Sequence, residues 1–87
     1  GLSSNTVLSL MYDNANRLWI GTENGGINVL QNGEMQSIKR EQGLANDIIW
    51  SIAEDYDGNV WVGTEKGLDR IQPDQDAFKI TNFMNWY

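Results

Sequence analysis

The segment Asn-Val-Trp-Val-Gly-Thr at residues 59–64 decides the fold, because a close copy of it, Arg-Leu-Trp-Ile-Gly-Thr, stands at residues 17–22. In both copies a tryptophan lies between aliphatic residues and a Gly-Thr pair follows. A short run of aliphatic and aromatic residues that ends at a turn signal is typical of a β-strand. The repeat is the starting point for the whole chain, since internal repeats determine an architecture more firmly than single motifs do.

The two copies continue on both sides of this segment at a constant offset of 42 residues, with residues 1–25 on residues 43–67. Ordinary composition predicts on the order of one or two identities over such a length. Nine positions are identical: Gly1/Gly43, Leu2/Leu44, Ser9/Ser51, Asp13/Asp55, Trp19/Trp61, Gly21/Gly63, Thr22/Thr64, Glu23/Glu65 and Gly25/Gly67. Beyond that point the second copy is one residue shorter, which indicates a loop.

Each copy contains four short segments with the composition of β-strands, joined by turn residues. The predicted strands are residues 7–12, 18–22, 26–30 and 35–39 in the first copy and 49–54, 60–64, 68–72 and 77–81 in the second. Asn16 and Gly58 occupy the same place in the first link, and both tolerate a positive φ angle. Asn32-Gly33 predicts a type I′ hairpin between the last two strands, and Pro73-Asp74 is the predicted turn at that place in the second copy.

Four hairpin-linked strands that recur at roughly 40 to 45 residues are typical of β-propeller blades. We therefore predict an all-β fold of two blade repeats, each a four-stranded antiparallel sheet. Residues 1–42 form repeat 1, and residues 43–87 form repeat 2 plus a C-terminal extension. The extension, Asn82-Phe83-Met84-Asn85-Trp86-Tyr87, is rich in aromatic residues. It begins a link to a further blade, or it is a strand end that packs on the edge of the ring.

The composition of the chain argues against several classes of function. The formal net charge of −6 argues against nucleic acid as a partner, since phosphate binding needs clustered Lys and Arg. No apolar run approaches the length of a membrane span, so we expect no membrane insertion by this segment. The chain has no Cys and no His. The absence of His removes the usual general base and the His-containing zinc sites, and we predict no cofactor, no metal site and no enzymatic activity.

The shared pattern resembles a known repeat. Asp, then Asn-x-Leu-Trp-Ile-Gly-Thr or Gly-x-Val-Trp-Val-Gly-Thr, then Gly followed by Ile or Leu, is similar to the two-component regulator propeller repeat, and both copies match from about Leu2 to Ile80. The resemblance implies the periplasmic sensor part of a membrane-anchored hybrid histidine kinase, and an oligosaccharide as the ligand. The chain departs from the family in length, because it carries two blades where a closed ring needs about four to eight.

This shortfall predicts the partners. A blade buries both of its faces against neighbouring blades, so two blades alone leave two apolar faces open, and such faces drive association. The expected partners are other propeller blades, either from the rest of a longer parent protein or from further copies of this chain. Three or four copies in a homo-oligomer would supply six or eight blades, which is a closed number.

The repeated motifs have structural interpretations that outweigh functional ones. Trp19 and Trp61 are predicted to pack between blades rather than to stack on sugars, since each buries a large area. The Gly-Thr pairs lack the Gly-rich run, the Lys and the helix of a phosphate loop. Asp55-Tyr56-Asp57-Gly58 starts like a calcium loop, but Val60 and Lys66 stand where an EF-hand needs Gly and Glu, so we predict a hairpin turn.

Ligand binding is instead assigned to the loops, because functional residues concentrate on loops that a rigid scaffold holds. The candidate ligand-binding residues are Asn24, Asn46, Asp47, Trp50, Lys66 and Arg70. Three alternatives remain open. The blades could form a scaffold for protein–protein contact or sensor dimerisation, they could belong to a propeller lyase or hydrolase, or the chain could be an excised or engineered repeat. The last of these would have no role as a separate chain.

Overall fold

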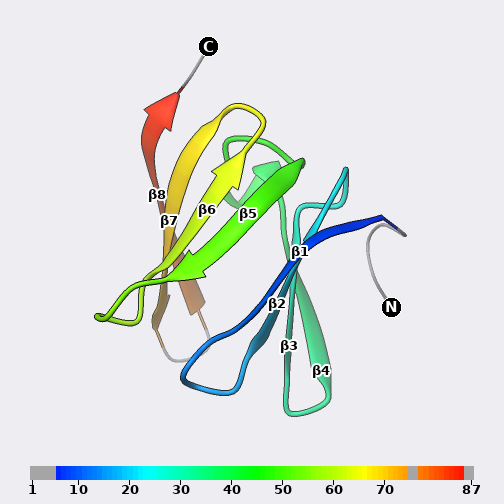
Figure 1. Ribbon diagram of the computed structural model, residues 1–87, viewed down its shortest axis with the longest axis vertical. Helices are drawn as coiled ribbons and strands as arrows, with labels where there is room; N and C mark the ends of the chain where they lie inside the picture. The colour runs from blue at the N-terminus through cyan, green and yellow to red at the C-terminus, as the bar shows by residue number, and fades with distance from the viewer. Residues whose placement is uncertain (1–5, 75–76, 86–87) are drawn as a thin grey trace.

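Two four-stranded antiparallel sheets make up the computed structural model, which describes residues 6–74 and 77–85 (Figure 1). The first sheet contains β1 (Val7–Tyr12), β2 (Leu18–Thr22), β3 (Ile27–Gln31) and β4 (Glu34–Ile38), and the second contains β5 (Ile49–Glu54), β6 (Val60–Thr64), β7 (Gly67–Asp74) and β8 (Ala77–Asn85). In each sheet the strands pair in chain order. The predicted all-β fold of two blade-like sheets is confirmed.

The hairpin turns have the backbone conformations that their residues predict. The φ angles of Asn16 and Gly58 are 64° and 81°, at equivalent places in the β1–β2 and β5–β6 turns. Asn32 and Gly33 have φ angles of 53° and 80°, and a type I′ turn requires a positive φ at both of its central residues. Residue types that enter the left-handed region at low cost therefore mark these hairpins in the sequence.

The turn predicted at Pro73-Asp74 is wrong. Both residues belong to β7, where Pro73 pairs with Phe78 and Asp74 with Ala77, so this hairpin is longer than that of the first sheet. The last residue of β7 that pairs with β6 is Ile71. Beyond that residue β7 has a strand on one side only, and proline is tolerated because its missing N–H is not needed on the open side. The turn itself falls outside the described residues.

The C-terminal extension continues the last strand. Residues 82–85 are part of β8, which pairs with β7 as far as Asn85 and Gly67. A register shift between Leu68 and Asp69 accompanies this pairing. Trp86 and Tyr87 lie outside the described residues. Between the sheets, the chain makes one short 3₁₀ helix, Arg40–Gln42. Among the described residues, no helix is long and apolar enough to cross a membrane.

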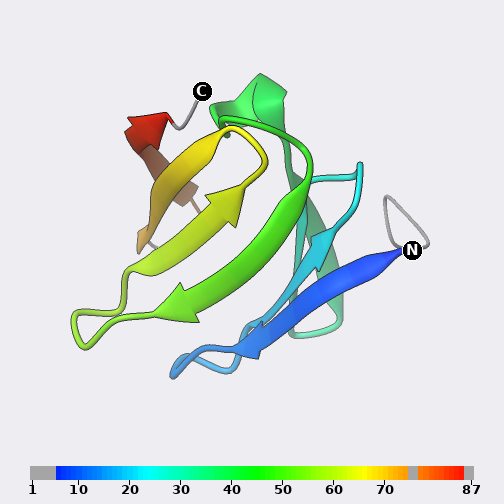
Figure 2. The ribbon, with the colours of Figure 1, turned by 45° about the horizontal axis from the view of Figure 1, so that its top comes forward.

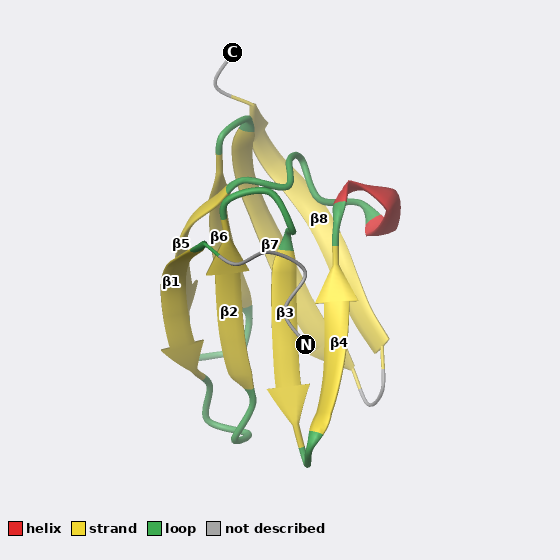
Figure 3. Ribbon diagram, turned by 90° about the vertical axis from the view of Figure 1, so that its right-hand side faces the viewer, coloured by secondary structure: helices red, strands yellow, loops and turns green. Residues whose placement is uncertain are grey.

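The core lies between the two sheets, which stand one behind the other in Figure 3. Contacts between the sheets concentrate where β1 and β2 face β5 (Figure 2). The buried cluster draws on both sheets and on the linker: Trp19, Ile27, Val29, Ile38, Leu44, Ile49, Val60, Val62 and Ile71. Aliphatic residues alternate along the strands, so one face of each sheet supplies this cluster. The two sheets therefore pack face to face, as neighbouring propeller blades do.

Candidate functional site

The loops at one edge of the two sheets form a continuous rim, which we define as residues 23–26, 39–48 and 65–66 (upper edge in Figure 1). Two main-chain hydrogen bonds connect its parts. The amide of Gly26, in the β2–β3 loop, donates to the carbonyl of Asp47 in the linker at 3.0 Å, and the amide of Glu65, in the β6–β7 loop, donates to the carbonyl of Ile48 at 3.0 Å. Loops of both sheets therefore meet along the linker.

Buried threonines shape the two loops that carry Asn24 and Lys66. The hydroxyl of Thr22 donates to the carbonyl of Gly26 at 2.8 Å and accepts the amide of Gly25 at 2.9 Å. The hydroxyl of Thr64 makes the corresponding bonds with Gly67, both at 3.0 Å. The repeated Gly-Thr pair thus closes a tight loop from within, which agrees with its structural interpretation.

Asp47 lies at the centre of the rim. One carboxylate oxygen accepts the amide of Arg40 at 2.9 Å. Asp47, Arg40 and Glu41 line a hollow of about 370 Å³, which is within the range of small-ligand sites. The neighbouring Asn46 is used differently, because its side-chain oxygen accepts the amide of Ile48 at 2.8 Å and so holds the linker in its turn.

Trp50 is the exposed aromatic residue next to this linker. Its side chain is 53% exposed, and its indole N–H donates to the carboxylate of Glu65 at 2.5 Å. The ring is therefore held at one end by a charged acceptor while much of its surface stays open to solvent. Lys66 follows Glu65 in the same loop and donates its amide to the hydroxyl of Thr64 at 3.2 Å. Asn24 is exposed in the β2–β3 loop.

The structure thus brings four of the six candidate residues to the rim, Asn24, Asn46, Asp47 and Lys66. It places Trp50 beside the rim at the start of β5, and Arg70 elsewhere. Arg70 lies within β7, where its guanidinium stacks 4.8 Å from the ring centre of Phe83 and 5.9 Å from that of Trp61. The candidate set also omitted Arg40, Glu41 and Glu65. The available signal was nearness to predicted residues, since Arg40 and Glu41 lie in the linker that carries Asn46 and Asp47, and Glu65 directly precedes Lys66.

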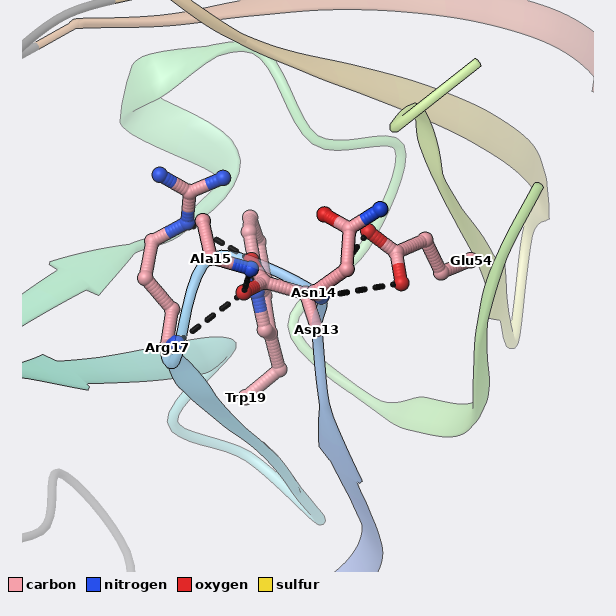
Figure 4. Close-up of polar contacts among 6 residues, drawn as sticks. All are labelled: Asp13, Asn14, Ala15, Arg17, Trp19 and Glu54. Carbon is pink, nitrogen blue, oxygen red and sulfur yellow. Dashed lines mark hydrogen bonds and ion pairs between the residues drawn. The ribbon is translucent and has the colours of Figure 1, made fainter. Parts of the chain in front are cut away.

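A second polar arrangement, at the opposite edge, is built around Asp13 (Figure 4). Asp13 accepts four hydrogen bonds in the β1–β2 turn. One oxygen accepts the amides of Ala15 and Arg17, both at 2.9 Å. The other accepts the Nε of Arg17 at 2.6 Å and the indole N–H of Trp19 at 2.8 Å. The aspartate therefore ties the turn to the buried tryptophan of β2.

The second sheet repeats this motif around Asp55. One of its oxygens accepts the amides of Asp57 and Asn59, both at 2.9 Å, and the other accepts the indole N–H of Trp61 at 2.9 Å. The side-chain amide of Asn59 donates to the same second oxygen at 3.2 Å and takes the place of the arginine in the first copy. The Asp-to-Trp spacing of six residues in both copies was the signal that could have revealed this pair.

These hydrogen bonds keep both aspartates ionised. Burial raises the pKa of Asp13, but the bonds from Trp19, Arg17 and Ala15 outweigh burial and hold that pKa below its usual value. The hydrogen bond from Trp61, with the bonds from Asn59 and Asp57, lowers the pKa of Asp55 to about 2 against a smaller opposing effect of burial. A carboxylate with such a low pKa serves as a charged acceptor and is a poor proton donor or acceptor near neutral pH.

Beside Asp55 lies a second hollow, of about 430 Å³, which Asn14, Glu54, Asp55 and Tyr56 line. The amide of Asn14 donates to both carboxylate oxygens of Glu54, at 3.1 and 3.3 Å, and so links the turn of the first sheet to β5. The carboxylate of Asp55 is used within its own turn. Across the residues that the structure describes, no three Asp or Glu side chains gather closely enough to hold a metal ion.

Comparison with known proteins agrees with the paired sheets. A search of curated proteins finds no match. A family model described as two component regulator propeller matches residues 1–24 and again residues 43–66, which together are more than half of the chain. Each match contains the first two strands of one sheet, with the Asp–Trp pair and the Gly-Thr loop signal. The chain therefore belongs to the two component regulator propeller family.

Proposed function

We propose that this chain is a ligand-sensing segment of a periplasmic, membrane-anchored two-component sensor, and that its ligand is an oligosaccharide that is bound without being chemically converted. Family membership supports the regulatory role. The observation that carries the proposal is the rim, where loops of both sheets meet around the hollow lined by Arg40, Glu41 and Asp47.

The chemistry of the rim suits a sugar. Hydroxyl groups both donate and accept hydrogen bonds, and the guanidinium of Arg40 offers donors while the carboxylates of Glu41 and Asp47 offer acceptors. Trp50 adds a half-open aromatic face whose N–H is already paired with Glu65. A ring that is fixed at its polar end presents an apolar surface for the C–H face of a pyranose at little cost in conformational entropy.

The test is binding to a glycan array, followed by calorimetry with the best oligosaccharide. Trp50→Ala removes the open ring, and Asp47→Asn removes a charge while keeping an oxygen for the amide of Arg40. The matched control is Tyr56→Ala, because Tyr56 is also an exposed aromatic residue but lies at the opposite edge. We expect Trp50→Ala and Asp47→Asn each to weaken binding at least tenfold, and the control to bind as the unaltered chain does.

Two results would overturn the proposal. An array on which no oligosaccharide binds would remove the ligand class. A loss of binding in Tyr56→Ala with none in Trp50→Ala would move the site to the hollow beside Glu54 and Asp55.

A further inference from the structure

The interface between the two sheets is a contact between unlike faces. The first sheet contributes the face that carries Trp19 and Val29, and the second contributes the face that carries Val60 and Ile71. Because the two sheets are copies of each other, the second sheet also has a face like that of Trp19, and the first sheet also has a face like that of Val60. The chain therefore presents one unused face of each kind, on its two outer sides.

The unused face of the first sheet, which we name the leading face, carries Val7, Leu10, Tyr12, Leu18, Ile20, Leu30 and Met35, of which Ile20 is buried. Four of these side chains are exposed, Val7 by 41%, Leu10 by 62%, Tyr12 by 72% and Met35 by 37%. Their counterparts in the second sheet are less exposed: Ile52 and Glu54, which correspond to Leu10 and Tyr12, are half-buried. Ile49, the counterpart of Val7, is 0% exposed, because it lies in the interface.

The unused face of the second sheet, which we name the trailing face, consists of Trp61, Gly63, Leu68, Arg70 and Phe83. A glycine in it indicates what packs there. A Cβ added at Gly21, its counterpart, would meet the hydroxyl of Ser9 in its own sheet and, at 2.7 Å, the Cγ2 of Ile49. Glycine there therefore makes room both for that serine and for a β-branched residue of the next sheet. At Gly63 the added Cβ would meet the hydroxyl of Ser51, the equivalent of Ser9, at 2.6 Å, and among the described residues no side chain of another sheet takes the place that Ile49 has at Gly21. The residue of this chain that corresponds to Ile49 is Val7 on the leading face.

A difference between the two tryptophans indicates which blade the trailing face accepts. Phe78 of the second sheet contacts Trp19 edge-on, with ring centres 5.4 Å apart. Phe78 comes from the longer β7–β8 hairpin, and the β3–β4 hairpin of the first sheet turns at Asn32-Gly33 before reaching an equivalent position. The β3–β4 hairpin of a leading face therefore has no counterpart of Phe78 to place against the tryptophan that it covers.

On the trailing face, an aromatic ring of the same sheet takes the place beside Trp61 that Phe78 has beside Trp19. Phe83, on β8 of the same sheet, lies 5.1 Å from Trp61, and the guanidinium of Arg70 stacks on both rings. Stacking of this kind lets arginine lie within a largely apolar contact. The trailing face thus carries its own ring beside Trp61, at the point where the β3–β4 hairpin of a leading face has no counterpart of Phe78.

We propose that the trailing face binds the leading face of a second copy of this chain, with Val7 of one copy against Gly63 of the next, in the arrangement that Ile49 and Gly21 have inside one copy. Such an unlike-face contact passes from copy to copy and closes into a ring when the rotation permits it. Three or four copies give six or eight blades, which are numbers that closed propellers have. The inference concerns assembly and stands apart from the proposed ligand.

Native mass spectrometry and light scattering of the intact chain test this proposal. We expect a mass of three or four chains that holds on moderate dilution. Leu10→Glu places a charge on the leading face, and Leu68→Glu places one on the trailing face. The matched control is Gln36→Glu, which adds the same charge at an exposed position on neither open face. Circular dichroism of each variant verifies that its strands form.

Mixing identifies the contact. Leu10→Glu leaves the trailing face unaltered, and Leu68→Glu leaves the leading face unaltered. Each variant alone is therefore expected to have the mass of one chain. An equimolar mixture is expected to contain a pair of chains, joined through the two unaltered faces. Gln36→Glu is expected to assemble as the unaltered chain does. An unaltered chain that stays at the mass of one chain at high concentration would overturn the proposal and assign the open faces to other blades. Folded variants that assemble like the unaltered chain would overturn it as well.

Discussion

The buried aspartate of the first turn makes a sharp prediction for stability. Asp13→Asn replaces a group that accepts four hydrogen bonds with one that has a single acceptor oxygen and an NH₂ group. If the oxygen stays with the amides of Ala15 and Arg17, the NH₂ group faces the Nε of Arg17 and the indole N–H of Trp19, which are both donors. The reverse orientation leaves the two amides unpaired. Two donors lose their acceptor in either case.

The magnitude follows from burial. The Asp13 side chain is 0% exposed, that of Arg17 is 14% exposed, and the bond from Trp19 is buried, so water does not replace the lost acceptor readily. A buried donor without a partner costs about 1–3 kcal/mol, so two such donors cost about 2–6 kcal/mol. A chain of this size is typically stable by roughly 4–13 kcal/mol. The substitution therefore removes a large share of the stability.

Asp55→Asn is the matched control, since it makes the same chemical change in the second copy. Trp61 is only partly buried, and Asn59 supplies a neutral donor in place of the arginine, so water and side-chain rotation compensate for much of the change. The assay is urea unfolding followed by tryptophan fluorescence at one fixed protein concentration, because any association of chains also changes the midpoint. The reasoning would be refuted if Asp55→Asn lowered the midpoint as much as Asp13→Asn, or if neither changed it.

Three further predictions concern the same network and the sheet interface. A carboxylate whose folded pKa is depressed stabilises the fold above its unfolded pKa, so the stability due to Asp55 is expected to be complete above about pH 4 and to fade as pH falls toward 2; an NMR titration of that carboxyl group with a midpoint near 4 would contradict this. Gly21→Ala is expected to lower the melting temperature more than Gly63→Ala, because the new methyl group meets Ile49 of β5 as well as a serine. The overpacking at Gly21 costs about 1–3 kcal/mol. Equal melting temperatures would show that the interface between the sheets adjusts to the added methyl group. Phe78→Ala is expected to lower stability by about 3 kcal/mol, the low end of the range for a buried phenylalanine, because this ring is partly buried against the core. Phe83→Ala is expected to lower it by less, since that ring is 50% exposed. Urea midpoints in the opposite order would mean that the trailing face contributes more to stability than the core does.

Much of the fold could be predicted because its signals are local. Strands β1, β2, β5 and β6 have the bounds that the repeat indicated, and the turns at Asn16, Asn32 and Gly58 have the positive φ angles that their residue types favour. The turn at Pro73 was misplaced for a reason that is not local. Proline marks a turn in most contexts, and it fits a strand here because β6 ends before reaching it.

The candidate site was less predictable. The loop positions were found because the strands determine where the chain turns, so Asn24, Asp47 and Lys66 fall at one edge. Arg70, which the sequence also predicted to bind ligand, lies on a sheet face because strand residues alternate between the two faces. Arg40 and Glu41 line the hollow because the linker turns back on Asp47, and no repeat or motif marks that turn.

The sequence alone determined that this chain makes two similar four-stranded sheets, because strand and turn preferences act between neighbouring residues and the repeat shows them twice. It could not distinguish Trp19 from Trp61, which occupy the same place in the two copies. Only the tertiary structure decided that the first is fully buried under the next sheet and that the second is covered by Phe83 and Arg70 of its own sheet. The physical reason is that burial depends on what lies across an interface, and residues that are distant in the chain supply it.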